Sequence, residues 1–254
     1  MLLPRLIPVL TLIEDNVVKT RSFLNPKYVG DPLNAISIFS KLEADELMIL
    51  DISTSHNKIS TSTKVLSSIP RHASMPIGFG GGLATIDQVS KTIDLGFDKV
   101  LIRKKFMDFD FLETISGKYG NQALSVCLDI KFSTYSEKIF EVNSIGMTLS
   151  ESIQLSENLV AAGVGELIVH DIDRDGTRAG FRSFPLLTSL ITSLDIPIVS
   201  LGGCRSVEDA ANQLKNNPGL HSVAGGACFV FQGSRDAILL NYPDHIDWET
   251  LIAL

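Results

Sequence analysis

The stretch GGGLATID at residues 80–87 recurs as GGCRSVED at residues 202–209. Two further pairs recur in the same order: LDI at 50–52 with HDI at 170–172, and VLTL at 9–12 with CLDI at 127–130. The members of these pairs lie 122, 120 and 118 positions apart, close to half of the 254-residue chain. Short glycine motifs recur by chance, but three pairs in the same order indicate an internal repeat. We therefore expect a fold built from two similar halves.

Short apolar runs alternate with amphipathic segments along the whole chain. The expected strands are Leu6–Leu12, Leu47–Ile52, Pro76–Phe79, Lys99–Ile102, Ala123–Ile130, Glu166–Asp171, Pro197–Leu201 and Ser222–Gly226. The helical patterns between them include Pro32–Leu42, Thr85–Leu95, Thr148–Ala162 and Val207–Lys215. Most of these strands are apolar on both faces, which is typical of parallel strands that are covered on both sides.

The number of units favours a closed barrel. Eight strand–helix units in 254 residues give about 32 residues each, the size of a (β/α)₈ unit. An open doubly wound sheet is the alternative. We expect an α/β protein with one TIM-barrel domain over residues 1–254, whose half-barrels are about 1–120 and 121–254 and are related by two-fold symmetry.

The composition excludes several classes of protein. The formal net charge is −7, whereas a general nucleic-acid binder carries a basic excess. Hydrophobic residues make up 44% and charged residues 20%, which excludes wholesale disorder. The longest apolar run, Val223–Phe231, has nine residues, and a membrane span needs about 20. We expect no nucleic-acid partner and no membrane partner.

The cysteines and the N-terminal segment favour a cytoplasmic location. Arg5 interrupts the apolar start of the chain, and no small-residue cleavage site follows it, so a strand is expected rather than a signal peptide. The three cysteines are Cys127, Cys204 and Cys228. They are few and far apart, as in a reducing compartment. Four histidines show no metal-like spacing: His56, His72, His221 and His245. We expect no metal and no other cofactor.

Two glycine loops follow the third and seventh expected strands. The first glycine loop is Gly80–Gly82, including Gly81 and Gly82, and the second is Gly202 with Gly203. Glycines let backbone N–H groups approach an anion, and the following helix N-terminus attracts negative charge. Gly226 and Ala227 add small residues beside the second loop, where barrels often hold phosphate. A ligand with two anionic ends, spanning the barrel mouth, is expected.

A basic cluster follows the fourth strand. Arg103, Lys104 and Lys105 come directly after Ile102, which places them beside the first glycine loop. One interpretation is a solvated helix start, although cations oppose the helix dipole there. The other interpretation, which we favour, is neutralisation of a phosphate ligand.

Polar side chains at the strand ends are candidates for chemistry. Asp129 ends an otherwise apolar strand and is a candidate general acid/base, because buried carboxylates are costly unless they are paired or used. The symmetric position holds Thr11, which cannot act as a carboxylate acid/base. Further polar candidates at the same end are Asp51, His170 and Asp171. In the loop that follows, Asp175, Gly176 and Thr177 are expected to bind the phosphorylated ligand, because Gly176 and Thr177 can offer it hydrogen-bond donors. The run from 171 to 177 superficially suggests a calcium loop but lacks the spacing of an EF-hand.

Four charged residues begin strands. They are Arg5, Glu46, Lys99 and Glu166, at strands one, two, four and six. All four should lie at the N-terminal end of the barrel, opposite the chemistry, where two cations and two anions can neutralise one another in a ring. From the residues alone, a network that stabilises the barrel floor is the expected role.

The sequence resembles the cyclase subunit of imidazole glycerol phosphate synthase along nearly its whole length. The matching stretches include RLIP at 5–8, VVK at 17–19, GDP at 30–32, DEL at 45–47, LDI at 50–52, DKV at 98–100, LDIK at 128–131, GE at 165–166, IDRDGT at 172–177 and both glycine loops. The IDRDGT and DIK strings together are quite specific. The sister isomerase of histidine synthesis shares the glycine loops but matches these strings less well.

The resemblance implies a partner and a substrate class. In that family a glutaminase docks at the N-terminal face of the barrel, and its ammonia passes a charged gate to the active site. Arg5, Glu46, Lys99 and Glu166 match the four gate positions, and Asp98 matches a contact with the glutaminase. The family substrate is a bisphosphorylated ribulosyl compound. By the same resemblance Lys19 and Asp51 belong to the catalytic site with Asp129.

The chain departs from the family where the chemistry occurs. The family uses two catalytic aspartates; Asp129 matches the second, but Thr11 replaces the first. The usual Asn-Thr pair after the fourth strand is Arg103-Lys104, and a small hydroxyl residue near the seventh strand is Leu201. This combination resembles the divergent branch associated with sugar amidation in bacterial surface-polysaccharide synthesis. There, ammonia is thought to form an acetamidino group, with a glutaminase and a separate amidating enzyme.

The leading hypothesis is an ammonia-channelling synthase subunit that acts on a phosphorylated small molecule, in sugar amidation. Three alternatives remain. The chain could be an active histidine-biosynthesis cyclase, which is a lyase. It could be a non-catalytic conduit that activates the glutaminase. It could be a sugar-phosphate isomerase that needs no ammonia.

Overall fold

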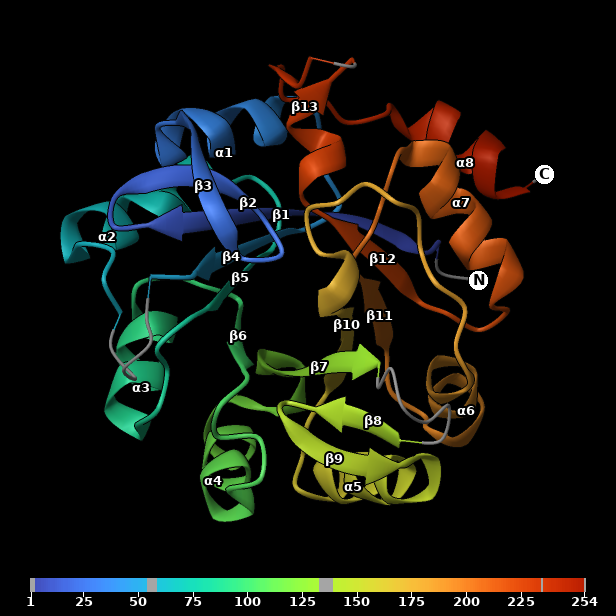
Figure 1. Ribbon diagram of the computed structural model, residues 1–254. Coiled ribbons are helices and arrows are strands. Elements are labelled where there is room, and N and C mark those ends of the chain that lie inside the picture. Colours follow the sequence, from blue (N-terminus) through green and yellow to red (C-terminus); the bar gives the residue numbers. More distant parts are fainter. Residues whose placement is uncertain (1–2, 54–58, 133–138, 234, 254) are drawn as a thin grey trace.

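Parallel strands close into a barrel in the computed structural model, which describes residues 3–53, 59–132, 139–233 and 235–253 (Figure 1). The barrel strands are β1 (Arg5–Ile13), β4 (Leu47–Asp51), β5 (Ile77–Gly80), β6 (Lys99–Ile102), β7 (Leu124–Phe132), β10 (Glu166–Asp171), β11 (Ile198–Leu201) and β12 (Ser222–Gly225). Each strand pairs in parallel with the next, β12 returns to β1, and β7 pairs with β10. The closed order confirms the barrel and excludes the open doubly wound sheet.

Helices cover the outside of the barrel (Figure 1). They are α1 (Pro32–Lys41), α2 (Thr63–His72), α3 (Ile86–Asp94), α4 (Phe109–Tyr119), α5 (Leu149–Ala161), α6 (Pro185–Ser193), α7 (Val207–Asn216) and α8 (His245–Ala253). Side-chain caps explain several of the starts. Thr85 and Thr148 cap α3 and α5 in capping boxes with Gln88 and Glu151, which satisfy backbone N–H groups that a helix start leaves free. No helix in the described part of the chain is long and apolar enough to cross a membrane.

The inward side chains of the barrel form three layers. Because side chains alternate along a strand, Arg5, Ile7 and Thr11 face the same way from β1. The middle layer is an apolar cluster that fills the barrel: Ile7, Val9, Met48, Leu101, Ile168, Val199, Leu201 and Ala224. A charged layer lies before it, at the strand starts, and a polar layer lies after it, at the strand ends. The larger apolar cluster, which includes Leu6 and Leu10, packs between strands and helices.

Two hairpins extend from equivalent barrel strands. β2 (Asn16–Arg21) and β3 (Leu24–Gly30) continue β1, whereas β8 (Ile139–Val142) and β9 (Ile145–Thr148) continue β7. The apolar pattern of the sequence predicts neither hairpin. Their matching positions fit the predicted relation between the half-barrels.

The expectation that the fifth strand ends near Asp129 is wrong. β7 runs to Phe132, because its last residues pair with β8, with Ile130 opposite Val142 and Lys131 opposite Glu141. Asp129 is therefore inside a continuous strand. The remaining short elements are β13 (Phe231–Gln232), β14 (Ala237–Ile238) and 3₁₀ turns at Asn121–Ala123, Ile172–Arg174 and Ala227–Phe229.

Candidate functional site

A cavity of about 350 Å³ opens at the carboxyl ends of the barrel strands. Each barrel strand, or the residue directly after it, contributes to the wall, through Thr11, Asp51, Gly80, Leu101, Cys127, His170, Leu201 and Gly226 among others. The carboxyl ends of the strands are the usual place for the active site of such a barrel. The geometry therefore makes this cavity the candidate active site.

The two glycine loops have matching backbone geometry. Gly81 has a φ of +114° and Gly202 a φ of +106°, a region that L side chains rarely adopt. A Cβ atom on Gly81 would lie 2.2 Å from the carbonyl oxygen of Asp51, and one on Gly202 would lie 2.4 Å from that of Asp171. Only glycine lets each loop pass so close to the end of the neighbouring strand.

The predicted phosphate-binding residues lie at one rim. Gly81, Gly82, Arg103, Lys104, Asp175, Gly176, Gly226 and Ala227 line the cavity. A small adjoining cavity is lined by Gly202 and Gly203 and shares the last four of those residues. Thr177 is not among the residues that line either cavity, and its hydroxyl donates to the carbonyl of Arg174 at 2.8 Å. Phosphate binding by these residues stays a prediction.

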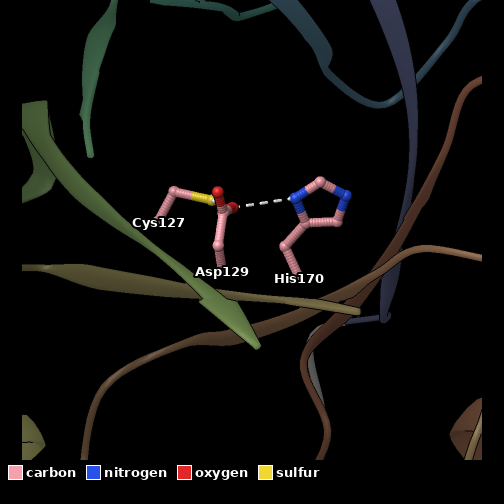
Figure 2. A group of neighbouring side chains, drawn as sticks. All are labelled: Cys127, Asp129 and His170. Atoms are coloured by element: carbon pink, nitrogen blue, oxygen red, sulfur yellow. Dashed lines mark hydrogen bonds and ion pairs between the residues drawn. The ribbon is translucent and has the colours of Figure 1, made fainter. Parts of the chain in front are cut away.

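Asp129 is the centre of a polar cluster (Figure 2). Its Oδ1 lies 3.0 Å from Nδ1 of His170, and its Oδ2 forms an ion pair with Nε of Arg103. The second ring nitrogen of His170, Nε2, lies 3.3 Å from Oδ1 of Asp175. Asp129 and His170 are direct neighbours in the register of β7 and β10, which explains why their side chains meet.

The cluster changes the acidity of its members. Burial raises the pKa of Asp129, but the hydrogen bond and charge of His170 and the charge of Arg103 outweigh it and hold that pKa below its usual value. Burial lowers the pKa of His170, but hydrogen bonds to Asp129 and Asp175 outweigh it and leave the pKa well above the usual value. Asp129 is thus held as a carboxylate with both oxygens occupied.

Thr11 leaves the first strand without a carboxylate in the cavity. The residue is 9% exposed, and its side-chain hydroxyl donates to the carbonyl of Val18 on β2. The hydroxyl hydrogen of Thr11 is therefore engaged in a hydrogen bond between β1 and β2. Asp129 lacks the acidic counterpart that the family resemblance places at this position.

The carboxylate of Asp51 accepts hydrogen bonds from the nearby residues Ser60 and Thr61 and is therefore not free to bind a ligand. Its carboxylate accepts from the backbone N–H groups of Ser60 and Thr61, each at 2.8 Å, and from the hydroxyl of Thr61 at 2.9 Å. Burial raises the pKa of Asp51, but hydrogen bonds from Ser53, Thr61 and Ser60 outweigh it and lower the pKa overall. Asp51 lines the cavity, and its catalytic role stays a prediction.

Lys19 brings a buried amine to the cavity. It lies on β2, is 5% exposed, and its Nζ donates to the carbonyl of Val9. Burial lowers the pKa of Lys19 to about 8, against the attraction of Asp175. An amine with a pKa near neutrality beside glycine loops can bind an anion or transfer a proton.

Replacing Lys19 with methionine should stabilise the fold at pH 7. The pKa of Lys19 is about 8 in the folded state and 10.5 in the unfolded state, so folding weakens proton binding by this amine. The resulting loss of stability has its full size below pH 8, decreases between pH 8 and 10.5, and is absent above pH 10.5. The difference between the two pKa values of Lys19 corresponds to a loss of about 3 kcal/mol in the free energy of unfolding. We expect Lys19→Met to raise the free energy of unfolding in urea at pH 7, and the gap from wild type to narrow toward pH 10. Lys91→Met, on the exposed face of α3, should show no such trend; a pH-independent gap for Lys19→Met would contradict the assignment.

At the opposite end of the barrel, four charges form a closed ring, called the charged ring below: Arg5, Glu46, Lys99 and Glu166. Arg5 pairs with Glu46 and, at 2.6 Å, with Glu166. Lys99 Nζ lies 2.9 Å from Glu46 and 3.1 Å from Glu166. The hydroxyl of Ser125 donates to Glu166 at 2.8 Å. Cations and anions alternate, so every charge has two opposite neighbours.

The charged ring is largely shielded from water. Burial raises the pKa of Glu166, but the charges of Lys99 and Arg5 outweigh it and lower that pKa overall.

Asp98, the predicted glutaminase contact, lies exposed at the same end, and its carboxylate accepts from the N–H of Ile77 at 2.8 Å. The structure therefore brings together every residue predicted for this end of the barrel.

Comparison with known proteins agrees with this architecture. The profile of a family described as "Histidine biosynthesis protein" matches residues 5–234. The chain belongs to this family. A Leptospira borgpetersenii protein is 34% identical over 255 residues, which cover 99% of each chain, and a Pseudomonas aeruginosa protein is 34% identical over 242 residues, which cover 94% of this chain and 96% of the other. Both are named "Putative imidazole glycerol phosphate synthase subunit", HisF in the first and hisF2 in the second.

The similarity extends to a third member of the family. A Dictyoglomus thermophilum protein named imidazole glycerol phosphate synthase subunit HisF is 32% identical over 235 residues, which cover 91% of each chain. The resemblance found in the sequence is thereby confirmed.

Within the cavity, the sequence pattern indicated His170 only as a titratable group and did not predict its contact with Asp129. That contact depends on the pairing of β7 with β10, which brings together two residues 41 positions apart along the chain.

Proposed function

We propose that this chain receives ammonia from a glutaminase at the N-terminal face of the barrel and uses it on a phosphorylated substrate, in the amidation of a sugar. One observation carries the proposal. The charged ring closes one end of the barrel, and the cavity with both glycine loops opens at the other end. A glutaminase docked over the ring would release ammonia on the barrel axis.

The apolar layer between the two ends suits a neutral molecule. Ile7, Met48, Leu101 and Ile168 fill the barrel between the charged ring and the cavity. An ammonium ion would need pairing there, because a buried unpaired charge is costly, whereas neutral ammonia carries no such penalty. The charged ring would have to open one ion pair to admit it, and Arg5, whose side chain is 29% exposed, is its most accessible member.

The cavity supports amidation rather than imidazole ring closure. Thr11 supplies no carboxylate, and both oxygens of Asp129 are occupied by Arg103 and His170. Ring closure in this family is expected to use two free aspartates. The numbered name hisF2 of one relative fits a branch beside the histidine-pathway subunit.

A second candidate function is a non-catalytic conduit that activates the glutaminase. The pairing of both Asp129 oxygens favours it, because a saturated carboxylate is a poor general acid/base. The two candidates differ in one result. Asp129→Asn should abolish amidation if the cavity performs chemistry and should leave it intact if the chain only conducts ammonia.

The test compares glutamine with ammonium salt as nitrogen sources. The chain is mixed with the glutaminase, the amidating enzyme and an acetylated amino sugar that carries a phosphate or diphosphate group, and amidated sugar is measured. We expect Arg5→Ala to lower glutamine-dependent amidation about tenfold, an effect of about 1.4 kcal/mol, because a ring that lacks Arg5 stays open to water and lets ammonia escape before it enters the barrel. Amidation supported by ammonium salt should be unchanged, which also shows that the variant is folded.

Arg71→Ala is the matched control. Arg71 is an exposed arginine on α2, and its loss should affect neither nitrogen source. If glutamine supports amidation equally well without the chain, or if Arg5→Ala lowers both activities in parallel, the proposed route of ammonia is wrong.

A further inference from the structure

Three side chains of different types converge on one point of the cavity wall. Cys127 and Asp129 lie two residues apart on β7 and so face the same side, and His170 is opposite Asp129 on β10. Figure 2 shows the thiol, the carboxylate and the imidazole turned toward one another. The sulfur of Cys127 lies 3.5 Å from Oδ1 of Asp129, Nδ1 of His170 lies 3.0 Å from that oxygen, and all three ligand atoms lie within 4.8 Å of one another.

We propose that Cys127, Asp129 and His170 bind a Zn²⁺ ion through Sγ, Oδ1 and Nδ1. Zinc takes four tetrahedral ligands, at about 2.3 Å for sulfur and about 2.0 Å for nitrogen and oxygen. Ligands at those distances lie about 3.3–3.6 Å apart. The two separations given above are close to these values, and the third, between Sγ of Cys127 and Nδ1 of His170, is at most 4.8 Å, so these two side chains would move toward each other as the site closes on the metal.

Neighbouring residues form hydrogen bonds and ion pairs that hold the proposed zinc ligands in place. A metal-bound histidine usually donates its other ring N–H to a carboxylate, which fixes its orientation. Nε2 of His170 lies 3.3 Å from Oδ1 of Asp175. Arg103 binds the other oxygen of Asp129, so Oδ1 is the oxygen that faces Cys127 and His170, and the metal would replace the hydrogen bond that Oδ1 now makes with Nδ1 of His170. The side-chain oxygen of Asn143 accepts from the backbone N–H of Asp129 at 2.7 Å and steadies β7 at this point.

The ligand types favour zinc over other common cations. A thiolate and an imidazole suit Zn²⁺, whereas Mg²⁺ and Ca²⁺ prefer oxygen ligands alone. Binding of Zn²⁺ would release to water the proton of the Cys127 thiol and any proton on Nδ1 of His170, and the resulting thiolate and the carboxylate together balance the two charges of the ion. Three protein ligands leave the fourth position open, as in catalytic zinc sites, and that position faces the cavity. A bound Zn²⁺ would present a Lewis acid to a carbonyl or phosphate oxygen of the ligand held there.

The test measures metal on the chain alone, without a glutaminase, so its result is independent of the proposed function. The protein is purified without a histidine tag, stripped with a chelator and reloaded with Zn²⁺, and the metal content is measured by mass spectrometry. We expect about one zinc per wild-type chain. Cys127→Ala and His170→Ala should each lower the zinc affinity at least about 100-fold, and Asp175→Asn should lower it about 10- to 100-fold through the orientation of His170.

Cobalt substitution identifies the sulfur ligand. Co²⁺ bound to a thiolate gives a charge-transfer band in the near ultraviolet, which should be present in the wild type and absent from Cys127→Ala. Cys204→Ala is the matched control, because Cys204 is also a buried cysteine and lies 3.2 Å from Cys228, away from the proposed site. The proposal is overturned if the wild type binds zinc no more tightly than Cys127→Ala, or if the cobalt band survives in Cys127→Ala and disappears in Cys204→Ala.

Discussion

Lys99→Met is expected to lower the free energy of unfolding by about 3–5 kcal/mol, the range found when one partner of a buried ion pair is removed. Lys99 is the only member of the charged ring besides Arg5 that neutralises Glu46 and Glu166. The side chains of Lys99 and Glu46 are 12% and 2% exposed, so water cannot solvate the anion that remains. Urea unfolding at pH 7, followed by circular dichroism, measures the change.

An exposed ion pair provides the control for this prediction. Lys91 pairs with Asp87 at 2.8 Å on α3, and both side chains are more than 70% exposed. Pairs of this kind contribute about 0–0.5 kcal/mol, so Lys91→Met should leave the unfolding curve nearly unchanged. Equal losses in Lys91→Met and Lys99→Met would mean that burial of the charged ring has no energetic consequence.

The second large effect concerns imidazole ring closure. With the ribulosyl substrate and ammonium salt, we expect turnover about 10²- to 10⁴-fold below that of a subunit with two catalytic aspartates, the usual loss when a general acid/base is missing. The hydroxyl of Thr11 is used by the carbonyl of Val18, and Asp129 is paired on both oxygens, so neither of these two positions offers a free carboxylate. Thr11→Asp should raise the residual turnover.

Thr11→Asn separates charge from size. Asparagine has nearly the same shape as aspartate but cannot exchange a proton, so it should not raise ring closure. Product formation is followed in the steady state for both variants. Turnover of the wild type at the level of a normal synthase would refute the claim that Thr11 disables cyclisation, and equal rates for Thr11→Asp and Thr11→Asn would remove the catalytic role from this position.

Both ends of the barrel contain buried charge, and this has a common physical cause. Inward side chains of a parallel barrel are removed from water whether they are apolar or polar, so Asp129 on β7 and Glu166 on β10 are buried by the same geometry as Ile7 on β1. Such groups cost stability unless they are paired. The barrel therefore has charged groups at both ends and an apolar layer between them, which distinguishes it from an entirely apolar core.

Most of the barrel could be predicted from the sequence. Runs such as Leu47–Asp51 and Lys99–Ile102 are apolar on both faces and short, and they could be assigned to buried strands without knowledge of their neighbours. The hairpin of β8 and β9 could not, because its strands are short and its pairing extends β7 beyond Asp129. Local patterns identify strands that are covered on both sides, but they do not identify strands whose stability comes from one neighbour.

The sequence by itself determined the repeat, the strand–helix alternation, the glycine loops and the four charges at strand starts, because each of these depends on spacing along the chain. Only the tertiary structure decided which side chains meet. His170 lies beside Asp129 because β10 pairs with β7 in one register, and Arg103 reaches the same carboxylate from the end of β6. The closure of the barrel sets these contacts, since it places residues that are far apart along the chain around one axis.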